Sequence, residues 1–140
     1  MSFIPDPETA PDPVTQLSAA ERAFYARQLI LPEIGIAGQL KLKAARVAVL
    51  GAGGLGAPAL LYLAGAGVGE IIIIDDDSIE ISNLHRQVIH SYARAGNSKA
   101  ESAAETMRAL NPFITVTVIR ERLTDSNALT LFSGADAVLD

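Results

Sequence analysis

Apolar residues are concentrated between residues 46 and 75, where they fall into three blocks that are interrupted by glycines. The first block, RVAVL at 46–50, and the last, EIIIID at 70–75, are short and almost continuously apolar. Such runs are typical of parallel strands that are covered on both faces. The middle block follows a glycine-rich turn and carries Pro58 near its start, where the missing N–H of proline costs nothing. The pattern therefore predicts a strand, a turn, a helix over 57–66 and a second strand.

The same region has the length of a membrane span, because the 23 residues from Val47 to Gly69 carry no charge. However, its glycines are clustered in GAGGLG and GAGVG rather than spread along the segment, and a β-forming run of isoleucines followed by three aspartates comes soon after it. Strand, turn, helix and strand explain this order better than a span does. We expect no membrane partner.

Signals for helices and further strands flank this region. Ser18 and Glu21 form a capping box ahead of AERAFYARQLIL, which predicts a helix that ends at Pro32. Ser98 and Glu101 form a second capping box ahead of an amphipathic pattern. The other predicted elements are helices over 38–44, 99–110 and 125–132 and strands over 113–119 and 136–140. Strands that alternate with helices predict an α/β fold, a Rossmann-like parallel sheet with flanking helices.

The two ends of the chain differ in what they predict. Residues 1–16 are rich in proline and poor in apolar residues, so we expect a flexible lead-in there. Residues 17–140 are expected to form one folded domain. The chain stops at Asp140, beside a predicted strand end, and ligands of such sheets bind outside the carboxyl ends of strands. We therefore expect the sheet to be truncated on its C-terminal side and the domain to be incomplete.

Composition narrows the function classes. The formal net charge of -5 argues against a nucleic-acid partner, which normally meets a basic patch. The chain has no cysteine, so it offers no disulfide framework, no thiolate metal site and no thiol nucleophile. The N-terminus lacks the basic and apolar regions of a secretory signal, and we expect a cytoplasmic location.

A glycine motif lies between the predicted strand and helix in the middle of the chain. Gly51, Gly53 and Gly56 satisfy G-x-G-x-x-G, and Asp75 follows Gly51 by 24 residues at the end of the second strand. The glycines permit a tight turn and bring backbone N–H groups close to phosphate oxygens, while the carboxylate accepts from ribose hydroxyls. The alternative is that the glycines only allow close packing of helix and strand. The motif predicts nucleotide binding but does not separate NAD from ATP.

Two cations follow the motif and favour a triphosphate. Arg86 ends the polar segment SNLHR, and Lys99 occupies the first position of a predicted helix, where the macrodipole disfavours a cation by about 0.3–1 kcal/mol. A lysine there is best explained by a strong anion opposite it, although solvated surface charge is the alternative for both residues. Asp75–Asp77 repel one another, so we expect one to face ribose and another to face water or Mg²⁺. Neither His85 nor His90 is assigned to a metal.

Four segments, in their order and spacing, resemble the ThiF/MoeB/HesA family, the bacterial relatives of ubiquitin-activating enzymes. They are YARQ at 25–28, GAGGLG at 51–56, DDDSIEISNLHRQ at 75–87 and HSYARAGNSKAESA at 90–103. The resemblance is strongest to molybdopterin-synthase and thiamine sulfur-carrier adenylyltransferases. It implies a nucleotide-binding domain for an ATP-dependent reaction. In that reaction the C-terminal glycine carboxylate of a ubiquitin-like sulfur-carrier protein attacks the α-phosphate of ATP, giving an acyl-adenylate and pyrophosphate.

The resemblance also implies roles for single residues. Asp75 holds the ribose, and Arg27 of YARQ reaches into the site of a second subunit, which implies a homodimer. Arg86, Lys99 and Arg27 are then the catalytic residues. The implied nucleotide contacts are Gly51, Gly53, Gly54, Gly56, Asp75, Asp77, Ser82, Asn83, Arg86 and Lys99. ATP and Mg²⁺ are the implied cofactors, and the family's Mg²⁺-assisting aspartate and structural zinc belong to segments beyond Asp140.

Two other functions remain open from the residues themselves. One is an NAD-dependent oxidoreductase domain, which would differ in whether Arg86 and Lys99 contact the phosphates of the ligand. The other is a non-catalytic module that recruits a ubiquitin-like partner. Within the adenylyltransferase interpretation, we expect the 140-residue chain to bind nucleotide without turning over.

Overall fold

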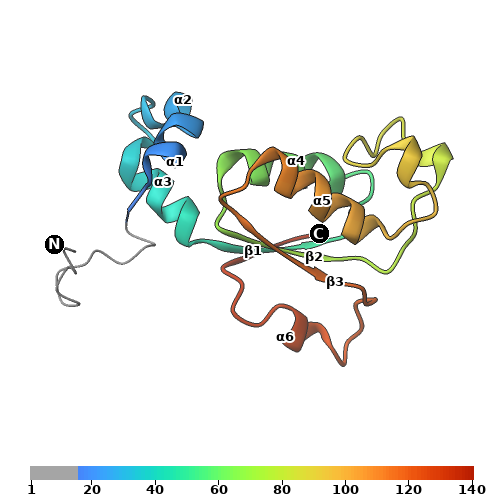
Figure 1. Ribbon diagram of the computed structural model, residues 1–140. Helices are drawn as coiled ribbons and strands as arrows, with labels where there is room; N and C mark the ends of the chain where they lie inside the picture. Colours follow the sequence, from blue (N-terminus) through green and yellow to red (C-terminus); the bar gives the residue numbers. More distant parts are fainter. Residues whose placement is uncertain (1–15) are drawn as a thin grey trace, which may run out of the picture. The chain divides into compact units, whose positions relative to one another are not determined.

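The computed structural model describes residues 16–140, so the predicted lead-in of 1–16 lies almost entirely outside the described residues (Figure 1). The chain divides into two compact units between Lys41 and Leu42. The described residues of the first unit form helices, and the second unit holds a parallel sheet with helices. The predicted domain boundaries, 17–140, stay a prediction.

The first unit begins at the predicted capping box. The backbone N–H of Glu21 donates to the Ser18 hydroxyl oxygen at 3.1 Å, and the Ser18 N–H donates to the Glu21 carboxylate at 2.8 Å. The single helix predicted behind this box is wrong, because it is interrupted at Tyr25, whose ψ of 10° leaves the helical range and whose ring is buried. The helices are α1 (Ala19–Phe24), α2 (Ala26–Leu29) and α3 (Gly35–Ala44), the last of which runs on into the second unit.

The second unit is built on four parallel strands in the order β3-β2-β1-β4. The strands are β1 (Arg46–Leu50), β2 (Glu70–Ile74), β3 (Thr115–Ile119) and β4 (Ala137–Leu139). The four isoleucines of β2 are all buried, as a strand covered on both faces requires. The predicted Rossmann-like parallel sheet is confirmed.

Helices cover both faces of this sheet, as Figure 1 shows. They are α4 (Gly56–Ala66), α5 (Lys99–Leu110) and α6 (Ala128–Leu131). Leu60 of α4 and Met107 of α5 pack with Val49 and Ile73 in the larger core, while Leu131 of α6 packs on the opposite face. Side chains alternate across a strand, so Ile71 and Ile73 face α4 and α5 whereas Ile72 and Ile74 face α6.

Several element boundaries differ from the predicted ones, and side chains explain two of them. The third strand begins at Thr115 rather than 113, because the Asn111 side chain accepts from the N–H of Phe113 and donates to the carbonyl of Ala64. The helix predicted over 125–132 is shorter, because the Asn127 carboxamide holds a turn ahead of it. Among the described residues, no helix combines the length and apolar character that crossing a membrane requires.

Candidate functional site

The glycine loop, residues 51–55, leaves β1 at its carboxyl end and leads into α4. Gly51 has a φ of 90°, a left-handed conformation that favours glycine. A Cβ at Gly56 would overlap the carbonyl oxygen of Gly51, so the first turn of α4 packs directly on the loop. Backbone geometry therefore requires glycine at both positions.

Three consecutive backbone N–H groups of the loop are available for a ligand. Those of Gly53, Gly54 and Leu55 have no hydrogen-bond acceptor among the described residues. They precede the 11-residue helix α4, whose N-terminal end carries partial positive charge. Unpaired N–H groups at such an end can bind phosphate oxygens. The loop therefore offers hydrogen-bond donors to an anion.

The loop also leaves space beside Gly53 and Gly54, and two side chains of the SNLHRQ segment border it. A Cβ placed at Gly54 would lie 3.9 Å from the Arg86 Nε, and one placed at Gly53 would lie 3.6 Å from the Gln87 Nε2. The structure therefore brings the predicted phosphate-binding arginine to the glycine loop, across a long stretch of sequence.

Neighbouring residues hold Arg86 in place. The segment starts with the 3₁₀ turn η2 (Ile81–Asn83), and the Arg86 Nη2 donates to the Asn83 side-chain oxygen at 2.8 Å. The His85 ring lies 3.0 Å from the backbone oxygen of Ser82 and 3.4 Å from the Arg86 Nη1. Asn83 and His85 therefore orient the guanidinium, whereas Ser82 contributes its carbonyl to this arrangement.

Lys99, the other predicted phosphate-binding cation, is only 7% exposed. Its Nζ lies 3.3 Å from the Asp77 carboxylate, and its backbone N–H donates to the Asp77 carbonyl at 3.0 Å. The sequence predicts a triphosphate opposite this lysine, whereas its partner in the structure is Asp77, so the phosphate contact stays a prediction. Because the Asp77 side chain is 60% exposed, the ion pair opens to solvent on one side.

Asp75 is buried at the end of β2 and uses both carboxylate oxygens. One accepts from the N–H of Ala52 and the other from the N–H of Asp77, each at 2.7 Å. Each carboxylate oxygen has a second lone pair, which can accept from a ribose hydroxyl as well. Asp75 therefore fixes the glycine loop and remains able to bind a nucleoside.

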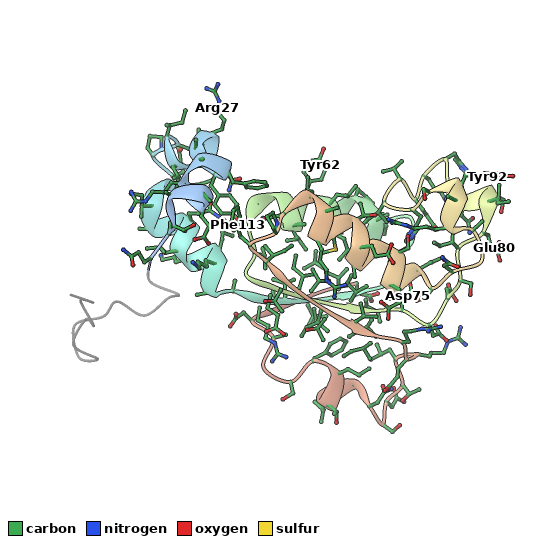
Figure 2. The ribbon with its side chains drawn as sticks, in the orientation of Figure 1. Arg27, Tyr62, Asp75, Glu80, Tyr92 and Phe113 are labelled. Carbon is green, nitrogen blue, oxygen red and sulfur yellow. The ribbon has the colours of Figure 1, made fainter. Side chains whose placement is uncertain are left out.

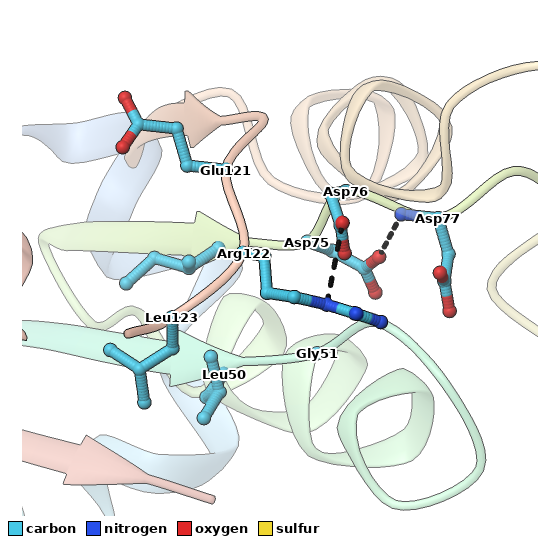
Figure 3. A pocket seen from close by; sticks show the side chains of 9 residues that line it. Leu50, Gly51, Asp75, Asp76, Asp77, Glu121, Arg122 and Leu123 are labelled. Atoms are coloured by element: carbon cyan, nitrogen blue, oxygen red, sulfur yellow. Dashed lines mark hydrogen bonds and ion pairs between the residues drawn. The ribbon is translucent and has the colours of Figure 1, made fainter. Parts of the chain in front are cut away.

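A pocket of about 320 Å³ lies beyond the carboxyl ends of β1, β2 and β3, close to the lower size of small-molecule sites (Figure 3). Leu50 and Leu123 supply apolar walls, and Asp75–Asp77 supply carboxylates. At the rim, the Arg122 Nε lies 3.6 Å from the Asp76 carboxylate. The position agrees with the rule that ligands of parallel sheets bind outside the carboxyl ends of strands.

The three adjacent carboxylates also resemble a cation site, because one oxygen of each lies within 4.8 Å of the others. Each carboxylate already has a partner, however: backbone N–H groups for Asp75, Arg122 for Asp76 and Lys99 for Asp77. These side chains offer the oxygen ligands that Mg²⁺ prefers, and the cation would compete with the existing partners.

Sequence reasoning missed two buried residues beside the loop. The His90 ring bonds to the Ala52 carbonyl and to the Ser102 hydroxyl, and the Gln87 side chain is 4% exposed with no partner for its Oε1. Nothing in the local pattern of the sequence marks either of them. Burial, together with a smaller effect from the charge of Lys99, lowers the pKa of His90 below 6.5.

Arg27, the third predicted catalytic residue, lies in the first unit on α2 (Figure 2). Its side chain is exposed and extends away from the helix. Its action in the site of a second subunit stays a prediction.

The residues of this site lie within a range that matches a known protein family. Residues 25–140 match the ThiF family. The matched range contains the glycine loop, Asp75–Asp77, Arg86 and Lys99. The chain belongs to the ThiF family. The resemblance expected from the sequence is therefore confirmed.

Similar curated proteins are named as two-function enzymes. This ThiF-family chain is 54% identical over 129 residues to the probable adenylyltransferase/sulfurtransferase MoeZ of Mycobacterium tuberculosis. The aligned residues make up 92% of this chain and 33% of MoeZ. It is 57% identical over 123 residues to the adenylyltransferase and sulfurtransferase UBA4 of Yarrowia lipolytica, and these residues make up 86% of this chain and 30% of UBA4. The chain spans about a third of the length of these relatives.

Solved structures share the fold and include nucleotide complexes. Escherichia coli tRNA N6-threonylcarbamoyladenosine dehydratase TcdA, in complex with AMP, superposes with a TM-score of 0.80 at 31% identity, over 88% of this chain and 50% of that one. Escherichia coli MccB with ATP superposes with a TM-score of 0.68 at 40% identity, over 71% of this chain and 30% of the MccB chain.

Proposed function

We propose that this ThiF-family chain is the nucleotide-binding part of an ATP-dependent adenylyltransferase that activates a ubiquitin-like sulfur-carrier protein. The observation that carries the proposal is the row of unpaired N–H groups at Gly53, Gly54 and Leu55, with Arg86 beside it. The names of the relatives MoeZ and UBA4 support the reaction class.

The reaction joins the C-terminal glycine carboxylate of the carrier to the α-phosphorus of ATP and releases pyrophosphate. Negative charge is spread over the phosphates in the transition state, so catalysis depends on positioning and charge neutralisation. The loop N–H groups orient the phosphates, and Arg86 neutralises them at the loop. Lys99 adds a second positive charge when the phosphates replace Asp77 as its partner.

The nucleoside end of ATP belongs in the pocket beyond β1, β2 and β3. Asp75 accepts from the ribose hydroxyls while it keeps its backbone hydrogen bonds to the loop. Asn83 acts through Arg86, whose guanidinium it orients. Bound Mg²⁺ supplies further neutralisation of phosphate charge, for which Asp76 and Asp77 offer oxygen ligands.

The finer expectations belong to the same proposal. They are a homodimer in which Arg27 completes the site of the second subunit, a cytoplasmic location, and a carrier of molybdopterin or thiamine synthesis. The NAD-dependent oxidoreductase and the non-catalytic module are the competing outcomes. Membership of the ThiF family, together with Arg86 at the loop, favours ATP over NAD.

Two experiments test the proposal. Calorimetric titrations with ATP and with NAD, each with and without Mg²⁺, should show tighter binding of ATP, and tighter binding of NAD would overturn the nucleotide assignment. Pyrophosphate exchange into ATP, with a glycine-terminated ubiquitin-like carrier, tests the reaction. We expect exchange from a version extended to the length of the relatives and not from the chain of 140 residues. If the extended version bound ATP but gave no exchange, the result would favour the non-catalytic module over the adenylyltransferase.

A further inference from the structure

His90 lies in the interior of the second unit, between the glycine loop and α5, and is 7% exposed. Its Nε2 is 2.9 Å from the carbonyl oxygen of Ala52 in the loop. Its Nδ1 is 3.0 Å from the Ser102 Oγ, one helical turn after Lys99 on α5. One side chain thus joins the glycine loop to the helix that carries Lys99.

The hydrogen-bond partners settle how the ring is protonated. A carbonyl oxygen only accepts, so Nε2 carries a hydrogen and donates to Ala52. Burial lowers the pKa of His90, which leaves the ring neutral near pH 7, and Nδ1 then accepts from the Ser102 hydroxyl. The charged groups that face the ring are Asp75 after β2, Arg94 on the 3₁₀ turn η3 (Tyr92–Arg94) and Lys99 on α5.

The bond to Ala52 has a consequence for the next residue. In a trans peptide unit the C=O of one residue and the N–H of the following residue point in opposite directions. All peptide bonds of the described residues are trans. Since the Ala52 carbonyl points at His90, the Gly53 N–H points away from it, and this N–H is one of the three without an acceptor.

We propose that His90 is a positioning residue, which donates to the Ala52 carbonyl and so fixes the direction in which the Gly53 N–H meets a nucleotide phosphate. The inference rests on the proposed function, because it requires that the glycine loop bind phosphate. His90 makes no contact with the nucleotide in this arrangement and acts through the loop.

The other polar atom of Ala52 is fixed as well, because its N–H donates to Asp75 at 2.7 Å. The peptide units on both sides of Ala52 are therefore anchored by buried groups. One is Asp75 at the end of β2, and the other is His90, whose ring also bonds to Ser102 of α5. A loop that is ordered before the ligand arrives loses less conformational entropy on binding. His90 thus contributes to phosphate affinity rather than to affinity for the nucleoside.

Two amide substitutions form a matched pair for the test. The amide nitrogen of glutamine reaches about as far as the histidine Nε2, whereas that of asparagine reaches only as far as Nδ1. His90→Gln therefore keeps a donor for Ala52, and His90→Asn loses it while remaining polar and uncharged. The dissociation constants of Mg²⁺-ATP and of adenosine are measured by calorimetry for the wild type and both variants, with the thermal unfolding midpoint of each.

We expect His90→Asn to weaken ATP binding by about tenfold or more while adenosine binding changes by less than about twofold. His90→Gln should keep both affinities within about threefold of the wild type. Unchanged ATP affinity in His90→Asn would overturn the proposal, and so would an equal loss of ATP and adenosine, which indicates a general structural role. If both variants lost affinity for ATP but not for adenosine, the proposed role of the Nε2 donor would be overturned.

A second measurement covers the case in which His90→Asn does not fold. In the wild-type chain labelled with ¹⁵N, the Gly53 amide resonance should move on addition of ATP and stay in place on addition of adenosine. A Gly53 amide that does not respond to bound ATP overturns the role of His90. A wild-type chain that fails to bind ATP at all overturns the proposed function, and the role of His90 falls with it.

Discussion

The Asp75 carboxylate accepts a hydrogen bond of 2.7 Å from the backbone N–H of Ala52, which lies 23 residues earlier in the chain. This bond ties the end of β2 to the glycine loop that follows β1. A charged acceptor on a backbone N–H makes a stronger bond than a neutral one. The residue expected to bind ribose therefore also holds the loop expected to bind phosphate.

Asp75→Asn should reduce the free energy of unfolding by about 1–3 kcal/mol. The backbone N–H groups of Ala52 and Asp77 each need an acceptor oxygen, and asparagine has only one. Its NH₂ group would therefore face one of these two N–H donors. The ribose contact predicts in addition a weaker affinity for adenosine as well as for ATP. Urea denaturation and calorimetry measure the two effects.

Asp76→Asn is the control, because among the described residues the Asp76 carboxylate pairs with the exposed Arg122 alone, at 3.6 Å. It should change stability by less than about 0.5 kcal/mol. Equal stability of the two variants would show that the buried bonds of Asp75 contribute nothing. Tighter ATP binding with unchanged adenosine binding in Asp75→Asn would mean that Asp75 acts only as a repulsive charge.

Arg86→Ala and Lys99→Ala should each weaken ATP binding by about tenfold or more, because charge-assisted contacts with phosphate are lost. Adenosine, which lacks phosphate, should bind as it does to the wild type. Calorimetry with both ligands measures the difference. Lys41→Ala is the matched control, because it removes an exposed cation of α3, ahead of the amino end of β1, and it should leave both affinities unchanged. A similar loss of ATP affinity in Lys41→Ala would mean that net charge alone explains the effect.

The glycines of the loop should separate into two classes. Gly56→Ala should prevent stable folding, because its Cβ would overlap the Gly51 carbonyl oxygen. Gly54→Ala should fold, since its Cβ meets no atom closer than the Arg86 Nε at 3.9 Å, but it should weaken ATP binding by filling the space beside the loop. Circular dichroism and calorimetry measure these outcomes. Gly65→Ala, where a Cβ meets nothing within 4 Å, is the control and should stabilise the chain by about 0.5–1 kcal/mol.

The stability of the chain should fall with decreasing pH because of His90. Its folded pKa is lowered from 6.5 mainly by burial, so the unfolded state takes up a proton first as the pH drops. The contribution is fully present above pH 6.5 and is lost as the pH falls from there towards the folded pKa. The greatest slope that one such group supplies is about 1.4 kcal/mol per pH unit.

Urea denaturation of the wild type and of His90→Gln at pH 7.5 and pH 5.5 isolates this effect, since glutamine does not titrate. We expect the free energy of unfolding to fall more steeply in the wild type than in the variant. Parallel declines in both proteins would assign the pH dependence to other groups.

The order of elements in the second unit followed from the sequence because it is written in local patterns. The isoleucine run predicts β2, and the capping serine at Ser98 predicts the start of α5; both are confirmed. The interruption at Tyr25 was missed, because the residues around it favour a helix, whereas its buried ring accompanies the break in the structure. The late start of β3 was missed because the Asn111 side chain takes the N–H of Phe113.

The glycines, Asp75 and Arg86 were named from the sequence, and the structure brings Asp75 and Arg86 to the glycine loop. Their contacts with a nucleotide stay a prediction. Lys99 was expected to face an anion, but its pairing with Asp77 was not foreseen. His90 had been given no role, since a single histidine after Val88 and Ile89 carries no local signal.

The sequence by itself determined the glycine turn, the buried strands and the family, because backbone conformation and apolar periodicity depend on residues that are close along the chain. Only the tertiary structure decided which groups hold the glycine loop and which carboxylate pairs with Lys99. The bonds Ala52–Asp75, Ala52–His90 and Asp77–Lys99 span 23, 38 and 22 residues. Partners at such separations meet only after the parallel crossovers have brought β1, β2 and α5 together, and a buried hydrogen bond forms only where donor and acceptor then lie within about 3 Å of each other.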